Sequence, residues 1–264
     1  MTERRPELRL RNSVVAAGVV ALVAAGGASV ATDQPHAQTG GVAILVYHRF
    51  EAEVHDSMAV TTSQFARHLQ YLADHQYRVI PFRNVVTSLQ RHEPLSNGVA
   101  ITVDDGHRSV YTDMLPLVRK YRVPVTLFIY PSAISNASYA MTWSQLQTLK
   151  ETGLFDIQSH TYWHPNFKTE RRRLDAPAFD KFVTMQLVKP RDVLHAKLGV
   201  DADMLAWPFG IYDDDLIRRA AAAGYVAALT LDARPVKPDD RLLALPRFLM
   251  TAGVSDKRFQ SMLP

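Results

Sequence analysis

The sequence predicts an α/β protein in which helices cover parallel strands that curl into a distorted (β/α)7-type barrel. From residue 42 onward, short apolar runs alternate with helical patterns, and about seven such runs recur without an internal repeat. This alternation is typical of a parallel sheet covered by helices. The chain has 264 residues, which suits a single folded domain, expected over residues 42–264.

Apolar runs bounded by turn residues give the expected strands, which lie at residues 42–47, 79–80, 99–103, 125–130, 155–158, 204–206 and 225–230. Amphipathic patterns give the expected helices, which lie at residues 63–75, 107–121, 143–151, 179–198 and 213–223. We expect a bend at Pro116 and a break near Pro190, because proline removes a helical hydrogen bond. Ser63 is a candidate N-cap of the first helix.

The first 31 residues predict an export segment. Four arginines among the first 11 residues precede an apolar stretch from Val14 to Val30, and Ser29-Val30-Ala31 offers small residues for a signal peptidase. The alternatives are an uncleaved N-terminal membrane anchor or a buried helix. Both the signal peptide and the anchor place the folded domain outside the cytoplasm, in the periplasm, cell envelope or extracellular space. Residues 32–41 are expected to form a linker.

Composition excludes several classes of function. The sequence has no cysteine, so disulfides, thiolate nucleophiles and Cys-rich zinc sites are excluded, and a metal must be held by His, Asp or Glu. The formal net charge is only +4, and the single conspicuous basic run, Arg171-Arg172-Arg173, is expected to be a solvated loop. We therefore expect no nucleic acid as a partner.

Two predicted strand ends carry side chains suited to metal chemistry. Asp104 and Asp105 follow the strand at 99–103, and adjacent residues point in different directions. One carboxylate can bind a metal while the other acts as a base, although an ordinary Asp-Gly turn is the alternative. His160 and His164 follow the strand at 155–158, and on a helical turn this spacing places both imidazoles on one face. Two His and one Asp would form a catalytic site with open positions.

A third strand end carries a loop of defined shape. Trp207-Pro208-Phe209-Gly210 follows the strand at 204–206. Proline and glycine restrict the loop, which can present a backbone N–H to a developing negative charge.

Together, Thr102–Gly106, His160–His164 and Pro208–Gly210 resemble motifs of the NodB-homology polysaccharide deacetylases, carbohydrate esterase family 4. Those motifs read T-F-D-D-G, H-[ST]-x-x-H and R-x-x-P-x-G, in that order. The resemblance covers Val42 to Leu249 and implies a single catalytic domain that hydrolyses linear amides, removing N-acetyl groups from a polysaccharide.

The resemblance also implies a role for each matching residue. Asp104 is implied as the catalytic base, and Asp105, His160 and His164 as ligands of a divalent metal. The metal is implied to be Zn²⁺, with Co²⁺ or Ni²⁺ in related enzymes. The backbone N–H of Phe209 is implied as the donor to the oxyanion.

Two departures from the family motifs point to one of its branches. No arginine precedes Pro208 at the motif position, and no histidine follows His195 to serve as general acid. His48, in the Tyr47-His48 pair after the first strand, resembles the N-terminal acid of the branch that deacetylates poly-β-1,6-N-acetylglucosamine, a biofilm exopolysaccharide. Arg247 with Asp232 is expected to replace the missing support of the base.

The substrate and its contacts follow from this branch. Trp163, Trp207 and Tyr212 are expected either to stack on sugar rings or to be core aromatics. The expected partners are the polysaccharide and an exopolysaccharide secretion machinery, with membrane contact only through an N-terminal anchor. The alternatives are a deacetylase of peptidoglycan, chitin oligomers or xylan, and a non-catalytic glycan-binding protein.

Overall fold

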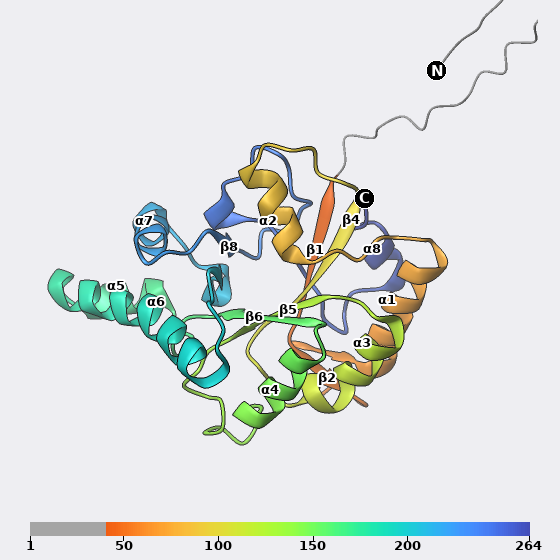
Figure 1. The fold of residues 1–264 in the computed structure, drawn as a ribbon, viewed down its shortest axis with the longest axis horizontal. Coiled ribbons are helices and arrows are strands. Elements are labelled where there is room, and N and C mark those ends of the chain that lie inside the picture. The colour runs from red at the N-terminus through yellow and green to blue at the C-terminus, as the bar shows by residue number, and fades with distance from the viewer. Residues whose placement is uncertain (1–40) are drawn as a thin grey trace, which may run out of the picture. The chain divides into compact units, whose positions relative to one another are not determined.

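The structure is a computed structural model that describes residues 41–264 (Figure 1). The predicted signal peptide or anchor at residues 1–31 and the linker up to residue 40 lie outside the described residues. Within residues 41–264, no helix combines the length and the apolar character needed to cross a bilayer.

Seven parallel strands form one curled sheet, and six of them lie where the sequence predicts strands, whereas the strand at Phe248–Leu249 was not predicted. Its spatial order is β8-β7-β6-β5-β4-β1-β9. The strands are β1 (Val42–Tyr47), β4 (Gly98–Val103), β5 (Val125–Ile129), β6 (Phe155–Ser159), β7 (Met204–Ala206), β8 (Ala227–Leu229) and β9 (Phe248–Leu249). A separate parallel pair consists of β2 (Arg49–Glu51) and β3 (Ala59–Thr61). In the described part of the chain, the edge strands β8 and β9 do not pair, so the barrel is partial.

Helices surround the sheet (Figure 1). They are α1 (Thr62–Asp74), α2 (Phe82–Gln90), α3 (Leu115–Tyr121), α4 (Trp143–Glu151), α5 (Phe167–Arg173), α6 (Ala176–Leu198), α7 (Asp214–Ala222) and α8 (Asp256–Gln260). A π-helical turn at Val110–Met114 leads into α3 just before Pro116, where the sequence predicts a bend. Thr61, and not Ser63, caps α1, through a hydrogen bond from the Gln64 N–H.

Successive residues of the central strands enter different cores, which is why these strands are continuous apolar runs. In β1, Leu45 and Tyr47 pack with α1 and α3, whereas Val42 and Ile44 pack with α2. The second of these clusters also takes side chains from β4, β5, β7 and β8, so it fills the concave side of the sheet. Both faces are covered, and the carboxyl ends of the strands are left to form a site.

Helices α5 and α6 correct two expectations. The break near Pro190 is wrong, because α6 runs unbroken for 23 residues. The cost of a proline inside a helix, about 3 kcal/mol, is offset by burial on both sides of it, through Val183 and Leu187 before it and Leu194 after it. The solvated loop at Arg171–Arg173 is also wrong, because these residues form the last turn of α5, where positive charge is favourable.

Two other elements differ from the sequence prediction. The strand at residues 79–80 is reduced to one bridge, between Val79 and Val99. The next helix, α2, was not predicted, although Phe82, Val85, Val86 and Leu89 show the i, i+3, i+4, i+7 spacing of its buried face. The sequence prediction assigned no element between Pro81 and Val99.

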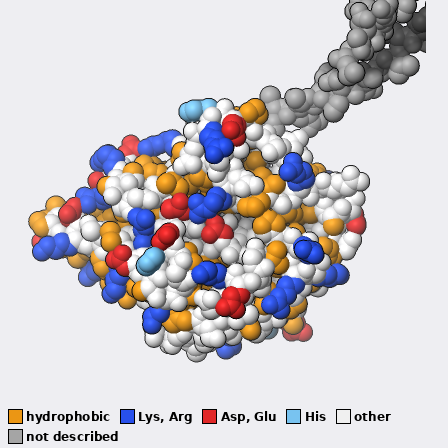
Figure 2. Space-filling model, in the orientation of Figure 1, with side chains coloured by type: hydrophobic (Ala, Val, Ile, Leu, Met, Phe, Trp, Pro, Cys, Tyr) orange, Lys and Arg blue, Asp and Glu red, His pale blue; other side chains and the backbone are white. Residues whose placement is uncertain are grey.

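Charged side chains of both signs are interspersed on the face shown in Figure 2, where no large basic patch gathers.

Replacing Gly210 by alanine is expected to destabilise the fold more than replacing Gly153. Both have left-handed φ, of 66° and 70°, so each alanine costs about 1–2 kcal/mol. A Cβ at Gly210 would also lie 3.0 Å from the Cβ and backbone N of Leu231, whereas a Cβ at Gly153 meets nothing within 4 Å. This contact should add about 1–3 kcal/mol. Urea unfolding measures both losses, and equal values would contradict the close approach of the loops after β7 and β8.

Candidate active site

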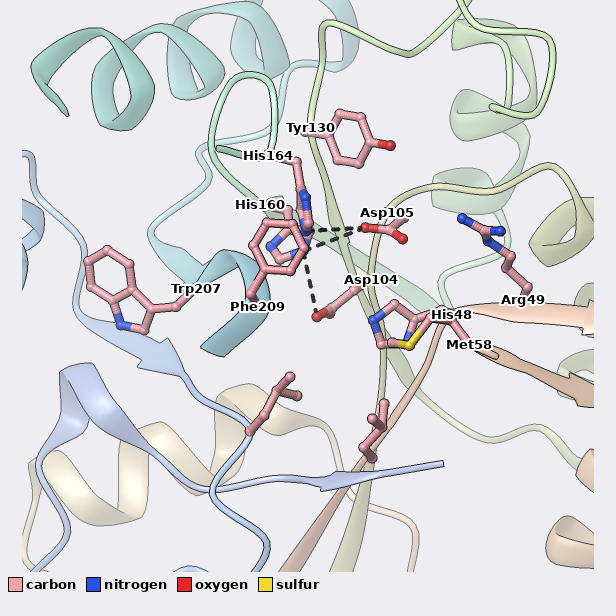
Figure 3. Close-up of a pocket in the computed structure, with 12 residues that line it drawn as sticks. His48, Arg49, Met58, Asp104, Asp105, Tyr130, His160, His164, Trp207 and Phe209 are labelled. Atoms are coloured by element: carbon pink, nitrogen blue, oxygen red, sulfur yellow. Dashed lines mark ion pairs between the residues drawn. The ribbon is translucent and has the colours of Figure 1, made fainter. Parts of the chain in front are cut away.

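The carboxyl ends of the strands surround a cavity of about 430 Å³ (Figure 3). The residues that line it come from the loops after β1, β4, β5, β6, β7, β8 and from β9. They are His48, Arg49, Met58, Asp104, Asp105, Tyr130, His160, His164, Trp207, Phe209, Leu231 and Leu249. The sequence predicts Asp104 and Asp105 at one strand end and His160 and His164 at another. The structure brings these four residues together in one cavity, which His48 also lines.

Asp104 follows β4 and is held by Arg247, which immediately precedes β9. Arg247 Nη1 and Nη2 each donate to one carboxylate oxygen of Asp104, both at 2.8 Å. Both side chains are buried. Burial alone would raise the pKa of Asp104, but the charges of Arg247 and His160 together lower it to about 2. Asp104 is therefore ionised throughout the neutral and mildly acidic range.

Asp105 points a different way because the chain turns sharply after β4. Asp105 and Gly106 both have left-handed φ, of 74° and 81°, and a Cβ at Gly106 would lie 3.0 Å from Ile129 Cγ2. The Asp-Gly turn considered as an alternative is thus present, and it also separates the two carboxylates. Burial, and then the charge of Asp104, raise the pKa of Asp105 to about 7. Its Oδ1 atom is buried and has no hydrogen-bond partner.

His160 and His164 converge on Asp105 from the turn after β6. Nε2 of His160 lies 3.6 Å from Asp105 Oδ1, and Nε2 of His164 lies 3.7 Å from the same oxygen. The helical turn expected for this segment is wrong, because Thr161 and His164 have left-handed φ of 66° and 63°. A tight irregular turn, and not a helix face, brings the imidazoles together.

Side chains replace the helical hydrogen bonds that this turn lacks. Gln186, buried on α6, accepts hydrogen bonds through Oε1 from the N–H groups of Tyr162 and Trp163, both at 3.1 Å. Thr161 Oγ1 accepts from the His164 N–H at 3.2 Å. Sequence analysis missed Gln186. It could have been found as a polar residue on the otherwise apolar, buried face of a long helix, next to Leu187.

Asp105, His160 and His164 fit a divalent cation. One ligand atom from each lies within 4.8 Å of the other two. Nδ1 of His160 lies 2.7 Å from the Ala206 carbonyl oxygen, which places the proton on Nδ1 and the Nε2 lone pair toward Asp105. Burial lowers the pKa of His160 to about 3 and also lowers that of His164, so both rings are neutral. Two neutral imidazoles and a carboxylate are a donor set typical of catalytic zinc.

His48 follows β1 and enters the same cavity, where its ring lies beside Asp104 (Figure 3). It is buried, and its Nδ1 has no hydrogen-bond partner. Burial lowers the pKa of His48 to about 4, although the charge of Asp104 opposes this shift. The preceding Tyr47 enters the core instead, where its hydroxyl lies 2.9 Å from His68 Nδ1.

Arg247 lies where the sequence predicts support for the base, but Asp232 contributes differently. Asp232 touches Arg247 only through its backbone, since its carbonyl accepts the Arg247 N–H at 3.1 Å. The Asp232 carboxylate instead accepts from the Tyr212 hydroxyl at 3.4 Å. Besides Asp104, the Arg247 guanidinium donates to the Thr230 carbonyl from Nε at 2.9 Å and to Thr102 Oγ1 from Nη1 at 3.3 Å.

The aromatic residues predicted near the substrate divide into two groups. Phe209 is 56% exposed, lines the cavity and lies 4.6 Å from the His164 ring, between centroids. Trp163 is 47% exposed but packs beside Phe182, outside the cavity lining. Trp207 is fully buried, and its Nε1 donates to the Leu243 carbonyl at 3.0 Å, so it is a core aromatic.

Comparisons with known sequences identify the family to which this site corresponds. Residues 92–228, just over half of the chain, match the family model for polysaccharide deacetylase. The chain is 24% identical over 209 residues to a poly-beta-1,6-N-acetyl-D-glucosamine N-deacetylase of Staphylococcus epidermidis, covering 78% of this chain and 71% of that protein. A Staphylococcus aureus enzyme of the same name is 22% identical over the same coverage.

Solved structures share the fold. The chain superposes on a Streptococcus pyogenes deacetylase, PplD, in complex with acetate, with a TM-score of 0.76, 21% identity and coverage of 86% of this chain and 100% of that one. IcaB from Ammonifex degensii gives a TM-score of 0.72 and 22% identity, with coverage of 84% and 95%. With the family model and the shared fold in agreement, the chain belongs to the polysaccharide deacetylases and is a hydrolase.

Proposed function

We propose that this enzyme removes N-acetyl groups from an N-acetylglucosamine-containing exopolysaccharide of the poly-β-1,6-N-acetylglucosamine type. The observation that carries the proposal is His48, a buried histidine with a free ring nitrogen that reaches the cavity from the first strand. It supplies the general acid that the chain lacks after residue 195. The two staphylococcal relatives are named for this activity, and their similarity extends over 78% of this chain.

Asp105, His160 and His164 are proposed to hold the metal, with Zn²⁺ favoured and Co²⁺ or Ni²⁺ as alternatives. When bound, the metal would supply a Lewis acid that polarises the acetamide carbonyl and acidifies water. Asp104 is not part of the cluster formed by Asp105, His160 and His164, and its two oxygens each accept one hydrogen bond from Arg247. It is ionised at neutral pH and accepts the proton of the attacking water.

The remaining residues stabilise charge and move the second proton. The backbone of Phe209 is held in a left-handed conformation at the cavity wall, and its N–H is proposed to donate to the carbonyl oxygen as negative charge develops. That negative charge favours the protonated form of His48, which otherwise has a pKa of about 4. His48 then donates its proton to the departing amine.

Export is proposed from the N-terminal sequence alone. Basic residues, an apolar stretch and small residues follow one another within residues 1–31. The enzyme is proposed to act in the cell envelope or outside it, on a polymer delivered by exopolysaccharide secretion machinery, with any membrane contact made by this segment.

Acetate release from poly-β-1,6-N-acetylglucosamine oligomers by the zinc-loaded protein tests the function. Asp104→Asn and His48→Ala are each expected to lower kcat about 100-fold to 10,000-fold, the range for loss of a general base or acid. His195→Ala is the matched control, because His195 is exposed and pairs only with Asp201. Greater activity on chitin oligomers, peptidoglycan or xylan would reject the polymer, and sugar binding without acetate release would favour a glycan-binding protein.

Gln186→Leu is expected to weaken zinc binding about 10-fold to 100-fold, the usual effect of losing a group that orients metal ligands. The turn that carries His160 and His164 would lose both acceptors for its N–H groups. Gln158→Leu is the control, because buried Gln158 also accepts two backbone N–H bonds, from Asp203 and Met204, away from the cavity. Zinc competition with a chelator measures both, and equal weakening would contradict a role specific to the turn.

A further inference from the structure

Five aromatic rings follow one another from the wall of the cavity to the surface beside it, and we name them the aromatic row; the first three line the cavity. In order, they are Phe209, His164, Tyr130, Tyr139 and His107. Centroids of the first two are 4.6 Å apart, and those of His164 and Tyr130 are 5.4 Å apart. The hydroxyls of Tyr130 and Tyr139 lie 2.7 Å apart, and the rings of Tyr139 and His107 have centroids 6.2 Å apart. Figure 3 shows the first three of these side chains around the metal ligands.

Phe209 at one end of the row and Tyr139 near the other end are exposed, whereas His164 between them is more buried. Phe209 is 56% exposed and Tyr139 is 39% exposed, whereas the side chain of His164 is 22% exposed. Five large apolar side chains are exposed within residues 41–264, and two of them belong to this row. Trp163, a third, immediately precedes His164. Such a concentration of exposed rings marks a binding surface more often than chance exposure does.

Tyr139 is exposed but fixed. Its hydroxyl is held by Tyr130, and its ring is parallel to that of His107 within 8°. Its backbone carbonyl accepts the Arg108 N–H at 2.8 Å, and the neighbouring Ala140 forms an antiparallel bridge with His107. An exposed aromatic side chain that is already ordered loses little conformational entropy on binding. This arrangement is suited to recognition, since packing alone would have buried the ring.

We propose that Tyr139 and His107 form a subsite for the sugar residue adjacent to the one that loses its acetyl group. The proposal rests on the proposed function, because it places that acetyl group at the metal ligands. Tyr130 lies between His164 and Tyr139, so the subsite begins one ring beyond the reacting centre. A flat aromatic face matches the apolar C–H face of a pyranose, and the paired hydroxyls of Tyr130 and Tyr139 offer hydrogen bonds to its hydroxyl groups.

The test compares a monomeric N-acetylglucosamine substrate with the β-1,6-linked pentamer, using zinc-loaded protein of measured metal content. Tyr139→Ala is expected to lower the ratio of kcat/KM for the pentamer to that for the monomer about tenfold, mainly through KM. Tyr139→Phe keeps the ring and should keep most of the ratio. Tyr121→Ala is the control, because Tyr121 on α3 also has a bonded hydroxyl, 2.8 Å from Gln70 Oε1, but lies outside the row.

Three results would overturn the subsite. The first is an unchanged ratio in folded, zinc-bound Tyr139→Ala. The second is an equal loss on both substrates, which would mean that Tyr139 acts through Tyr130 on the metal ligands. The third is a wild type that cleaves both substrates but shows no preference for length. Failure of the wild type to release acetate from either substrate would instead contradict the proposed function itself, and the subsite with it.

Discussion

The ion pair between Arg247 and Asp104 connects the fold to its chemistry. The edge strands β8 and β9 do not pair in the described residues, although Leu245, before β9, bridges to Leu229 of β8, and the guanidinium of Arg247 lies at the same junction. It donates to the Thr230 carbonyl just after β8 and to both oxygens of Asp104 just after β4, while its own backbone precedes β9. Removing one partner of such a buried pair costs about 3–5 kcal/mol, because the other charge is left unpaired. One side chain thus helps to close the partial barrel and holds Asp104, the proposed base.

The same pair gives two adjacent aspartates different properties. Arg247 and His160 keep the pKa of Asp104 at about 2, whereas burial and the Asp104 charge raise that of Asp105 to about 7. Environments that separate two carboxylates in this way are typical of sites where one acts as a base and the other does not. Asp105 would release its proton when a cation binds, which couples metal binding to pH.

Backbone strain is concentrated at this site. Eight non-glycine residues of the described chain have left-handed φ, and four of them are Asp105, Thr161, His164 and Phe209. Each costs about 1–2 kcal/mol in an ordinary loop. The structure sustains this cost at the turn after β6 because the buried side chain of Gln186 accepts hydrogen bonds from its backbone N–H groups. The strained turns bring Asp105, His160 and His164, the proposed metal ligands, to one point.

The sequence predicted most of the fold, because continuous apolar runs and helical periodicity are local patterns that can be recognised in the sequence itself. It also predicted the four residues Asp104, Asp105, His160 and His164, since strand ends of a parallel sheet share one edge. It did not predict the conformation of the His160–His164 turn or the role of Gln186, because both depend on contacts between α6 and β6 that no local pattern encodes. Asp232 was placed beside Arg247 correctly, but only its backbone makes the contact.

Carbon-13 NMR titration of the aspartate carboxyls in the metal-free protein is the most direct measurement of this division between base and ligand. The structure predicts that Asp105 titrates near pH 7, while Asp104 remains ionised until the protein unfolds in acid or until the pH approaches 2. Arg247→Met should raise the pKa of Asp104. If Asp104 instead titrated above Asp105, or if both titrated near the ordinary aspartate value, Asp104 would not be the carboxylate held ready as the base.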